Sequence, residues 1–153
     1  MKQNVLGSLL EAREALDNLL KNDMLLETIV AAGAELALAL KSGGRVFSCG
    51  NGGSMCDAAH FAEELSGRYR KNRPALAAAA ITDVGHMTCV ANDYGYEFVF
   101  SRYLEGHGRQ GDFLLAISTS GTSKSILNAV TEAKLRGMKV IGLHGHPGSA
   151  LGL

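Results

Sequence analysis

The chain has 153 residues and 46% of them are apolar, which suffices for one hydrophobic core but not for two domains. Its 15 basic and 15 acidic side chains give a formal net charge of zero, whereas nucleic-acid-binding domains normally carry a basic excess. No apolar run approaches the roughly 20 residues that span a bilayer, and no signal-type segment opens the chain. We therefore expect one cytoplasmic domain over residues 1–153, without a nucleic-acid or membrane partner.

Cysteine and glycine usage narrows the function classes further. The three cysteines, Cys49, Cys56 and Cys89, are odd in number and lack C-x-x-C spacing, so they support neither a disulfide framework nor a cysteine zinc site. The 19 glycines are clustered rather than periodic. Clustered glycine is typical of tight functional turns, so the glycine-rich segments are the first places to seek a binding site.

Residues 1–42 have the pattern of two helices. Leucines recur at helical spacing over residues 5–20, with charged residues between them. Asn22 and Asp23 are good N-cap residues for a second helix, whose apolar positions continue until Gly43 and Gly44. Neither helix carries a catalytic group, so we expect them to pack on the core or to cover a partner subunit.

From residue 45 onward, short apolar runs alternate with helical periodicity. This alternation predicts an α/β fold with βαβ units, a parallel sheet and helices on both faces. Around His86 we expect a turn or short helix, and the NDYG segment at 92–95 is a turn signal. The expected strands are 45–49, 77–81, 113–117 and 139–143, and the expected helices are 55–66, 97–105 and 124–136.

Two loops rich in glycine and hydroxyl side chains follow the first and third predicted strands: GNGGS at 50–54 and STSGTS at 118–123. The carboxyl ends of parallel strands meet at one edge of the sheet, which is the usual ligand crevice. Backbone amides, helix N-termini and hydroxyls can together hold a phosphate without an arginine. Neither loop matches a dinucleotide fingerprint or a nucleotide P-loop. The alternative for each loop is an ordinary turn with a Ser or Thr cap.

His60 and Glu64 lie four residues apart on the helix after the first loop, so they project from the same face. An imidazole nitrogen and a carboxylate oxygen at this spacing can share a divalent metal such as zinc, although two ligands do not complete a site. The alternative is a hydrogen-bonded surface pair. Glu63 is expected on another face, toward solvent.

The other histidines and one basic run are weaker candidates. His144 and His146 follow the last predicted strand and could reach the crevice, but for these two, as for His86 and His107, a plain loop histidine is the favoured interpretation. Asp93 could bind sugar hydroxyls. The basic run at 68–73 could offer one arginine to an acidic ligand, but such runs usually face solvent.

Four motifs, in order, resemble the bacterial phosphoheptose isomerases of the sugar isomerase (SIS) superfamily. They are CGNGGS at 49–54, DAAHFAEELSGRY at 57–69, NDYG at 92–95 and STSGTS at 118–123. The resemblance extends to about Gly145. It implies a flavodoxin-like three-layer sandwich over residues 45–153, preceded by helices in 1–42, and a homotetramer with active sites between subunits. It also implies isomerisation of sedoheptulose 7-phosphate to D-glycero-D-manno-heptose 7-phosphate, in the ADP-heptose route to the lipopolysaccharide core.

The resemblance also implies roles for individual residues. His60 and Glu64 would bind one zinc ion per subunit, and Glu64 would touch substrate as the catalytic base of an enediolate mechanism. Moving a proton between adjacent carbons needs such a carboxylate, and a metal can stabilise the enediolate. Substrate contacts would come from Asn51, Gly52, Gly53, Asn92 and Asp93, and phosphate contacts from Ser118, Thr119, Ser120 and Ser123.

One departure from the family affects the expected activity. The family has a further C-terminal strand and a long helix, with a glutamine and a histidine that complete the metal site and supply a second acid/base. The 153 residues stop before that segment. The chain by itself is therefore expected to hold two of four ligands and to be inactive.

Two other interpretations remain open from the sequence. A non-catalytic SIS module would bind sugar phosphates or a protein partner such as a replication initiator. The retained His60 and Glu64 disfavour this interpretation, whereas the missing second acid/base favours it. A plain scaffold is the third interpretation, and it predicts no thermal stabilisation by a sugar phosphate.

Overall fold

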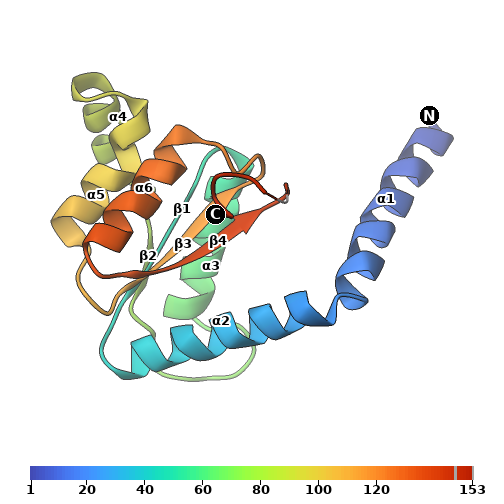
Figure 1. The fold of residues 1–153 in the computed structure, drawn as a ribbon, viewed down its shortest axis with the longest axis horizontal. Coiled ribbons are helices and arrows are strands. Elements are labelled where there is room, and N and C mark those ends of the chain that lie inside the picture. Colours follow the sequence, from blue (N-terminus) through green and yellow to red (C-terminus); the bar gives the residue numbers. More distant parts are fainter. Residues whose placement is uncertain (147, 153) are drawn as a thin grey trace. The chain divides into compact units, whose positions relative to one another are not determined.

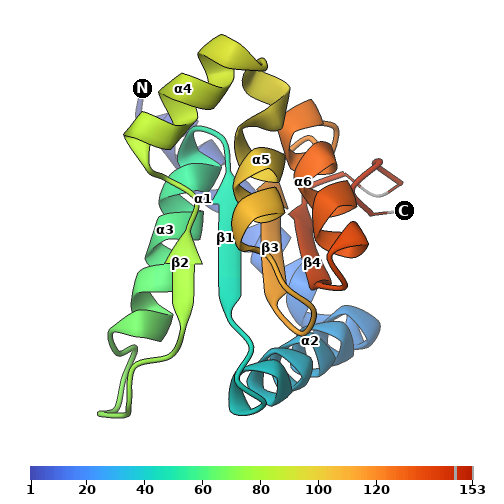
Figure 2. The ribbon, with the colours of Figure 1, turned by 90° about the vertical axis from the view of Figure 1, so that its left-hand side faces the viewer.

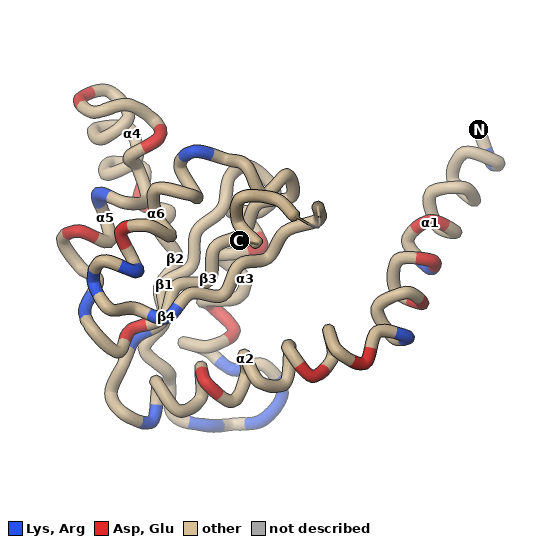
Figure 3. The backbone as a smooth tube through the Cα atoms, viewed as in Figure 1, with Lys and Arg blue, Asp and Glu red and all other residues tan. Residues whose placement is uncertain are grey.

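The computed structural model describes residues 1–146 and 148–152 and separates into two units, residues 1–35 and 36–153. Figure 1 shows the helices and strands of both units in chain order. Acidic and basic residues are interspersed along the chain (Figure 3). Within the part that the structure describes, no helix combines the length and apolar character that crossing a membrane requires.

The first unit consists of α1 (Lys2–Leu20) and most of α2 (Asp23–Lys41), which confirms the two predicted helices. The Asn22 side chain caps α2, because its oxygen accepts a hydrogen bond from the Leu25 amide at 3.0 Å. Neither helix has a buried residue, and the leucines of α1 are largely exposed. Packing within this unit therefore does not account for the apolar stripe of α1.

A four-stranded parallel sheet forms the centre of the second unit, in the order β2-β1-β3-β4. This is the strand order of a flavodoxin-like sheet, and it confirms the predicted fold class and all four predicted strands. β2 is only three residues long, in agreement with the low β-propensity of alanine. The strands are β1 (Val46–Gly50), β2 (Ala78–Ala80), β3 (Phe113–Ser118) and β4 (Lys139–His144).

Helices cover both faces of this sheet, as Figures 1 and 2 show. α3 (Gly53–Ser66) packs on one face, and α5 (Val99–His107) and α6 (Lys124–Leu135) pack on the other. α4 (Val84–Asp93) lies beyond the carboxyl ends of β1 and β2 (Figure 2), and the 3₁₀ helix η1 (Tyr96–Phe98) links it to α5. The carboxyl edge is thus bordered by α4 and by the starts of α3 and α6.

The segment between β2 and α5 is more helical than its sequence pattern predicts. α4 has ten residues where a turn or short helix was expected around His86, and Asn92 and Asp93 lie in its last turn. Asp83 caps α4, because its carboxylate accepts a hydrogen bond from the His86 amide at 2.6 Å. The turn falls at Gly95, whose φ of 104° favours glycine. The next predicted helix begins as η1 and continues as α5.

The larger hydrophobic core lies between the sheet and α4, α5 and α6. Phe100, Leu104 and Leu114 are fully buried there. The core under α3 is smaller and centres on Leu115 and Ile117. Because the larger core includes residues of both β1 and β3 and the smaller core includes residues of β3, the ends of these two strands are fixed in position, and so are the starts of the loops that follow them.

Candidate functional site

The loops after β1 and β3 meet at the carboxyl edge of the sheet, as predicted. The Asn51 side chain donates hydrogen bonds to the hydroxyls of Ser123, at 2.9 Å, and of Ser125, at 3.0 Å. β1 and β3 are adjacent parallel strands, so their last residues deliver both loops to one place. The two segments therefore form one structure rather than two separate turns.

The loop after β3 is organised by its own hydrogen bonds. The Ser118 hydroxyl accepts from the Gly121 amide at 3.2 Å, and the Ser120 hydroxyl accepts from the Thr122 amide at 3.3 Å. Gly121 has a φ of 66°, and a Cβ there would lie 2.1 Å from Oγ of Ser149. Residues 118–123 include no lysine or arginine, so an anion would be held by hydroxyls, amides and the N-terminus of α6.

Described residues after β4 are hydrogen-bonded to the same loop. The Gly145 amide donates to the Thr119 carbonyl, and the Leu151 amide donates to the Gly121 carbonyl, each at 3.0 Å. The His144 ring makes its hydrogen bonds within this C-terminal segment. His144 thus stabilises the support of the loop, which is its structural role in this chain.

His60 and Glu64 lie on α3, the helix that starts at the first loop. His60 Nε2 and Glu64 Oε1 are 3.2 Å apart, so the two side chains share a face as the spacing predicts. With a rise of about 1.5 Å per residue, His60 lies roughly 10 Å along the helix from Gly53. An extended ligand could reach from the loops to this pair, whereas a single anion could not.

The two members of the pair differ in burial. The His60 side chain is 71% exposed and the Glu64 side chain 28%. Oε2 of Glu64 is buried and has no hydrogen-bond partner among the described residues. A buried carboxylate oxygen without a partner is costly, so a proton, a cation or a ligand donor at this atom would lower the free energy.

Glu63 belongs to the same cluster, which the sequence reasoning missed. Its side chain is exposed, as expected, but the prediction that it lies on another face from His60 is wrong. One ligand atom each from His60, Glu63 and Glu64 lie within 4.8 Å of one another. Residues three apart on a helix are also neighbours, so the His60–Glu63 spacing could have indicated this arrangement. One nitrogen and two carboxylate donors suit a zinc-type ion.

A pocket of about 530 Å³ opens beside this cluster. Arg73, from the predicted basic run, donates a hydrogen bond to the Glu64 carbonyl at 2.6 Å. One arginine of the run therefore lies at the pocket wall. The pocket is lined by Asp57, His60, Phe61, Glu64, Leu65, Tyr69 and Arg73.

Asn92 and Asp93 lie exposed at the end of α4 and contact each other. Asn92 Nδ2 donates to Asp93 at 2.8 Å, and the Cys89 thiol donates to the other carboxylate oxygen at 3.5 Å. This hydrogen bond and the negative charge of Asp93 raise the pKa of the Cys89 thiol. Among the described residues, no hydrogen bond joins Asn92 or Asp93 to either loop; the connection runs instead through Tyr96, which donates to Asn51 Oδ1 at 2.8 Å.

Tyr96 and Ser125 are therefore site residues that the sequence reasoning missed. Tyr96 reaches Asn51 across 45 positions of the chain, and Ser125 reaches it across 74. No periodicity or motif marks either residue. The Tyr96 contact depends on where η1 lies and the Ser125 contact on where α6 lies relative to the first loop, and local sequence patterns encode neither.

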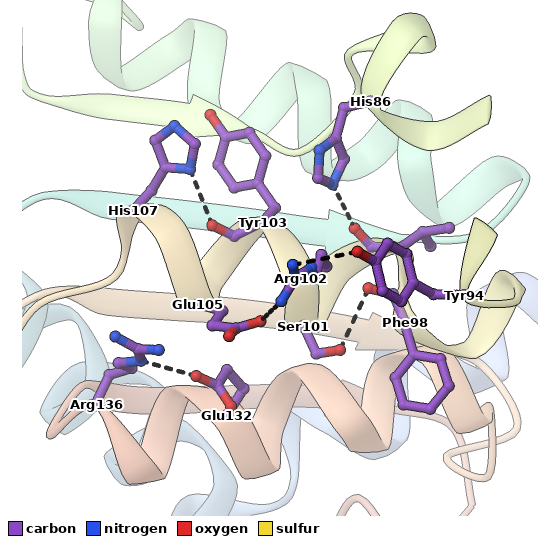
Figure 4. Close-up of polar contacts among 11 residues, drawn as sticks. His86, Tyr94, Phe98, Ser101, Arg102, Tyr103, Glu105, His107, Glu132 and Arg136 are labelled. Carbon is purple, nitrogen blue, oxygen red and sulfur yellow. Dashed lines mark hydrogen bonds and ion pairs between the residues drawn. The ribbon is translucent and has the colours of Figure 1, made fainter. Parts of the chain in front are cut away.

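His86 and His107 belong to an aromatic cluster, so the prediction of plain loop histidines is wrong. The His86 ring meets the ring of Tyr103 edge-on at 5.2 Å, and the His107 ring stacks on that tyrosine at 4.1 Å. His86 also bonds the Val99 carbonyl at 2.8 Å (Figure 4). His86 thus joins α4 to α5, whereas His107 packs within α5, and His146 is exposed.

A shallow groove of about 330 Å³ between α5 and α6 is a weaker candidate site, because its arginine is already paired. Arg102 forms an ion pair with Glu105 and lies 4.8 Å above the Tyr94 ring (Figure 4). The hydrogen bond and charge of Glu105 raise the pKa of the Arg102 guanidinium. Glu132, also in the groove, is paired with Arg136 at 2.7 Å.

All three cysteines are free thiols. Burial raises the pKa of the Cys49 thiol in β1 to about 12. Cys56 and Cys89 are exposed on α3 and α4. The raised pKa values of Cys49 and Cys89 do not favour a catalytic thiolate at either residue.

Comparisons with known proteins agree with this architecture. The SIS domain family model matches residues 10–145. The phosphoheptose isomerase of Pectobacterium atrosepticum is 56% identical over 152 residues, which cover 99% of this chain and 79% of that protein. That of Cytophaga hutchinsonii is 53% identical over 151 residues, with the same two coverages.

Two solved structures extend this similarity to three dimensions. The phosphoheptose isomerase GmhA from Neisseria gonorrhoeae has a TM-score of 0.91 at 38% identity, over 98% of this chain and 78% of that chain. The phosphoheptose isomerase from Francisella tularensis has a TM-score of 0.91 at 37% identity, over 99% and 79%. The chain therefore belongs to the SIS domain family and, within it, to the phosphoheptose isomerases, a family of isomerase enzymes.

Proposed function

We propose that this chain converts sedoheptulose 7-phosphate to D-glycero-D-manno-heptose 7-phosphate, in the cytoplasmic ADP-heptose route to the lipopolysaccharide core. One observation carries the proposal: the two loops are joined through Asn51, and the first of them continues into α3, which bears His60 and Glu64 roughly 10 Å away. A heptose 7-phosphate has a matching layout, since its phosphate and its reacting carbons lie at opposite ends of the molecule. The names of the relatives support the same reaction.

The loop after β3 would hold the phosphate. Its hydroxyls and amides are already organised by internal hydrogen bonds, so little conformational entropy would be lost on binding. The N-terminus of α6 adds partial positive charge. Holding the remote phosphate would fix the reacting carbons relative to α3. The residues proposed for this role are Ser118, Thr119, Ser120 and Ser123.

The first loop and the end of α4 would contact the sugar through Asn51, Gly52, Gly53, Asn92 and Asp93. Gly53 supports this role for the first loop. A Cβ at Gly53 would meet no atom within 4 Å, and its φ is not positive, so neither packing nor backbone strain requires glycine there. The open space is then available for close approach of a ligand to the backbone.

Glu64 would be the base that moves the proton. Its carboxylate would take the proton from carbon 1 of the open-chain ketose and return it to carbon 2, while the carbonyl changes from carbon 2 to carbon 1. The second proton, which moves between the two oxygens, needs another acid/base group, and the family resemblance attributes this role to a C-terminal histidine. The buried Oε2 of Glu64 supports this role, because it has no hydrogen-bond partner among the described residues and so can accept the proton.

The residues present fit a zinc ion. His60, Glu63 and Glu64 bring three potential ligand atoms within 4.8 Å, and the buried Oε2 of Glu64 has no partner among the described residues. We propose His60 and Glu64 as ligands, with Glu63 near enough to contribute. When bound, the metal would supply a Lewis acid that stabilises the negative charge of the enediolate.

We further propose a homotetramer with its sites at subunit interfaces. The support lies in α1, which has no buried residue but carries a large exposed apolar set. Such a set is unfavourable in water and marks a surface that another chain covers. The set comprises Val5, Leu6, Leu9, Leu10, Leu16 and Leu20.

The decisive experiment incubates the full product of this gene with sedoheptulose 7-phosphate and zinc and follows the aldehyde product by NMR. We expect turnover, and we expect deuterium from D₂O at carbon 2 of the product. Light scattering of the same sample should give the mass of a tetramer. Absence of turnover in a folded, zinc-loaded sample would contradict the proposal.

The same sample separates the two other interpretations. Thermal stabilisation by the sugar phosphate without turnover would indicate a non-catalytic binding module. A plain scaffold would show no stabilisation, whereas a binder at a ligand concentration of 100 Kd gains about 2.7 kcal/mol.

A further inference from the structure

We infer that Tyr96 is a positioning residue for the phosphate end of the site: its hydroxyl orients the Asn51 side-chain amide, which leaves the hydroxyl proton of Ser123 free to donate to the bound anion. This inference rests on the proposed function, because it concerns how the phosphate of the substrate is held. It also gives the Asn51 side chain a role in bracing the loops, so that a contact with substrate would come from the Asn51 backbone.

The hydrogen bonds at Asn51 are directional. The Tyr96 hydroxyl donates to Oδ1 at 2.8 Å, and Nδ2 donates to Ser123 at 2.9 Å and to Ser125 at 3.0 Å. An amide has two N–H donors and one oxygen, so each of its polar groups has a partner here. Among the described residues, the Ser123 side chain makes no cap hydrogen bond to α6, and its hydroxyl accepts from Asn51 but donates to no other group, so its proton remains available.

The orientation of the amide decides what Ser123 can do. If the Asn51 amide were flipped, Oδ1 would face the hydroxyls of Ser123 and Ser125, and both hydroxyls would donate their hydrogen bonds to it. Their lone pairs would then face the anion, which is repulsive. Because a phenolic hydroxyl is a stronger hydrogen-bond donor than acceptor, its bond to Oδ1 favours the orientation of the amide in which Ser123 remains a donor to phosphate.

Tyr96 is held in place independently of Asn51. Gly95, with φ of 104°, directs the chain into η1, and Asn128 of α6 donates to the Glu97 carbonyl at 3.0 Å. The Tyr96 side chain is 50% exposed, so its hydroxyl could bond water instead. The bond to Asn51 therefore reflects the way η1 is fixed on α6.

The test compares Tyr96→Phe, which removes only the hydroxyl, with Tyr94→Phe. Tyr94 is a matched control, because it is 54% exposed, lies two residues away, and accepts its hydrogen bond from Arg102 outside the loops. Inorganic phosphate binding is measured by calorimetry on the full gene product, and KM and kcat are measured with sedoheptulose 7-phosphate. For Tyr96→Phe we expect Kd and KM to rise about three- to tenfold, with kcat nearly unchanged. Tyr94→Phe should leave all three unchanged.

A double-mutant cycle that combines Tyr96→Phe with Ser123→Ala tests which residues transmit the effect of Tyr96. If Tyr96 acts through Asn51 and Ser123, Tyr96→Phe should have little further effect once Ser123 is alanine. Unchanged phosphate binding in Tyr96→Phe would overturn the inference, and so would effects that add fully in the cycle or that fall on kcat and thermal stability instead.

Failure of the inference and of the proposed function are distinguishable. Turnover by the unaltered protein with a silent Tyr96→Phe variant removes the inference alone. Tyr96-dependent phosphate binding without turnover removes the proposed function alone. An unaltered protein that neither binds phosphate nor turns over the sugar removes both.

Discussion

The loop edge and the α3 cluster differ in how completely one chain satisfies their polar groups. At the loop edge, Asn51 has partners for both its donors and its acceptor, and the loop after β3 closes on its own hydroxyls. On α3, His60 is largely exposed and Oε2 of Glu64 has no partner among the described residues. The loop edge is therefore organised before a ligand binds, whereas the α3 cluster needs further groups to satisfy its polar atoms.

This difference matches the two tasks in the proposed reaction. Binding a phosphate gains from donors that are fixed in advance, because fewer groups lose freedom on association. Proton transfer needs a carboxylate oxygen within hydrogen-bond reach of the substrate, and an oxygen without a protein partner can take this contact directly. A metal or a neighbouring subunit can complete the α3 cluster without any change at the loops.

Glu64→Gln should produce the largest effect, and it tests whether the α3 cluster is where the proton is transferred. The amide keeps the shape but cannot accept the proton, so we expect turnover and deuterium exchange to fall by about 10²- to 10⁴-fold. Phosphate binding at the loop edge should remain. NMR of deuterium exchange checks the loss of proton transfer, and calorimetry on the same sample checks that phosphate binding remains.

Glu63→Gln is the matched control on the neighbouring position. Its carboxylate is exposed and near the cluster, so we expect weaker zinc binding but retained proton exchange. Exchange at the normal rate in Glu64→Gln, or its loss in Glu63→Gln alone, would move the base from Glu64 to Glu63.

Gly121→Ala should produce the next largest effect and tests whether the loop edge is rigid. The added Cβ would meet Ser149 at a φ unsuited to alanine, so we expect a loss of about 2 kcal/mol and a Tm lower by about 4–8 °C. Phosphate binding should weaken as well. Gly106→Ala in α5 has open space and should leave Tm unchanged or slightly raised. A loop that accepted alanine at 121 without loss would not be preorganised.

The sequence predicts the parts of this comparison that are local. The short apolar runs before residues 50 and 118 predict the strands, and parallel strands bring their loops together. The i,i+4 spacing predicts the His60–Glu64 contact, since helix geometry alone sets it. These features need no knowledge of distant packing.

The parts that escaped prediction are non-local or depend on burial. The contact from Tyr96 to Asn51 follows from the placement of η1 on α6. The partnerless Oε2 of Glu64 follows from the surroundings of α3 and not from its spacing. α4 is the exception, because it had local signals both in the Asp83 cap and in the helical spacing of Met87, Val90 and Ala91, which the sequence reasoning missed.

Gly53→Ala should have a smaller effect and separates ligand contact from folding. The protein has room for a Cβ at this position, so Tm should hold or rise slightly, because alanine favours the start of α3. If the sugar approaches the backbone here, a methyl group would clash with it and reduce the binding free energy by about 1 kcal/mol. Sugar-phosphate binding should then weaken about fivefold. Normal affinity in this variant would exclude contact at Gly53.

Thiol labelling perturbs the protein least, and it probes the difference in solvent access between β1 at the loop edge and α3. Burial in β1 raises the Cys49 pKa to about 12, so at pH 8 roughly 10⁻⁴ of this thiol is ionised. We expect iodoacetamide to modify Cys56 on α3 first and Cys49 at least about a thousandfold more slowly, as read from peptide masses. Cys89 should label more slowly than Cys56, because Asp93 raises its pKa, and Asp93→Asn should speed its labelling below that pKa. Rapid labelling of Cys49 in the folded protein would mean that β1 opens and that the loop edge is not the closed region.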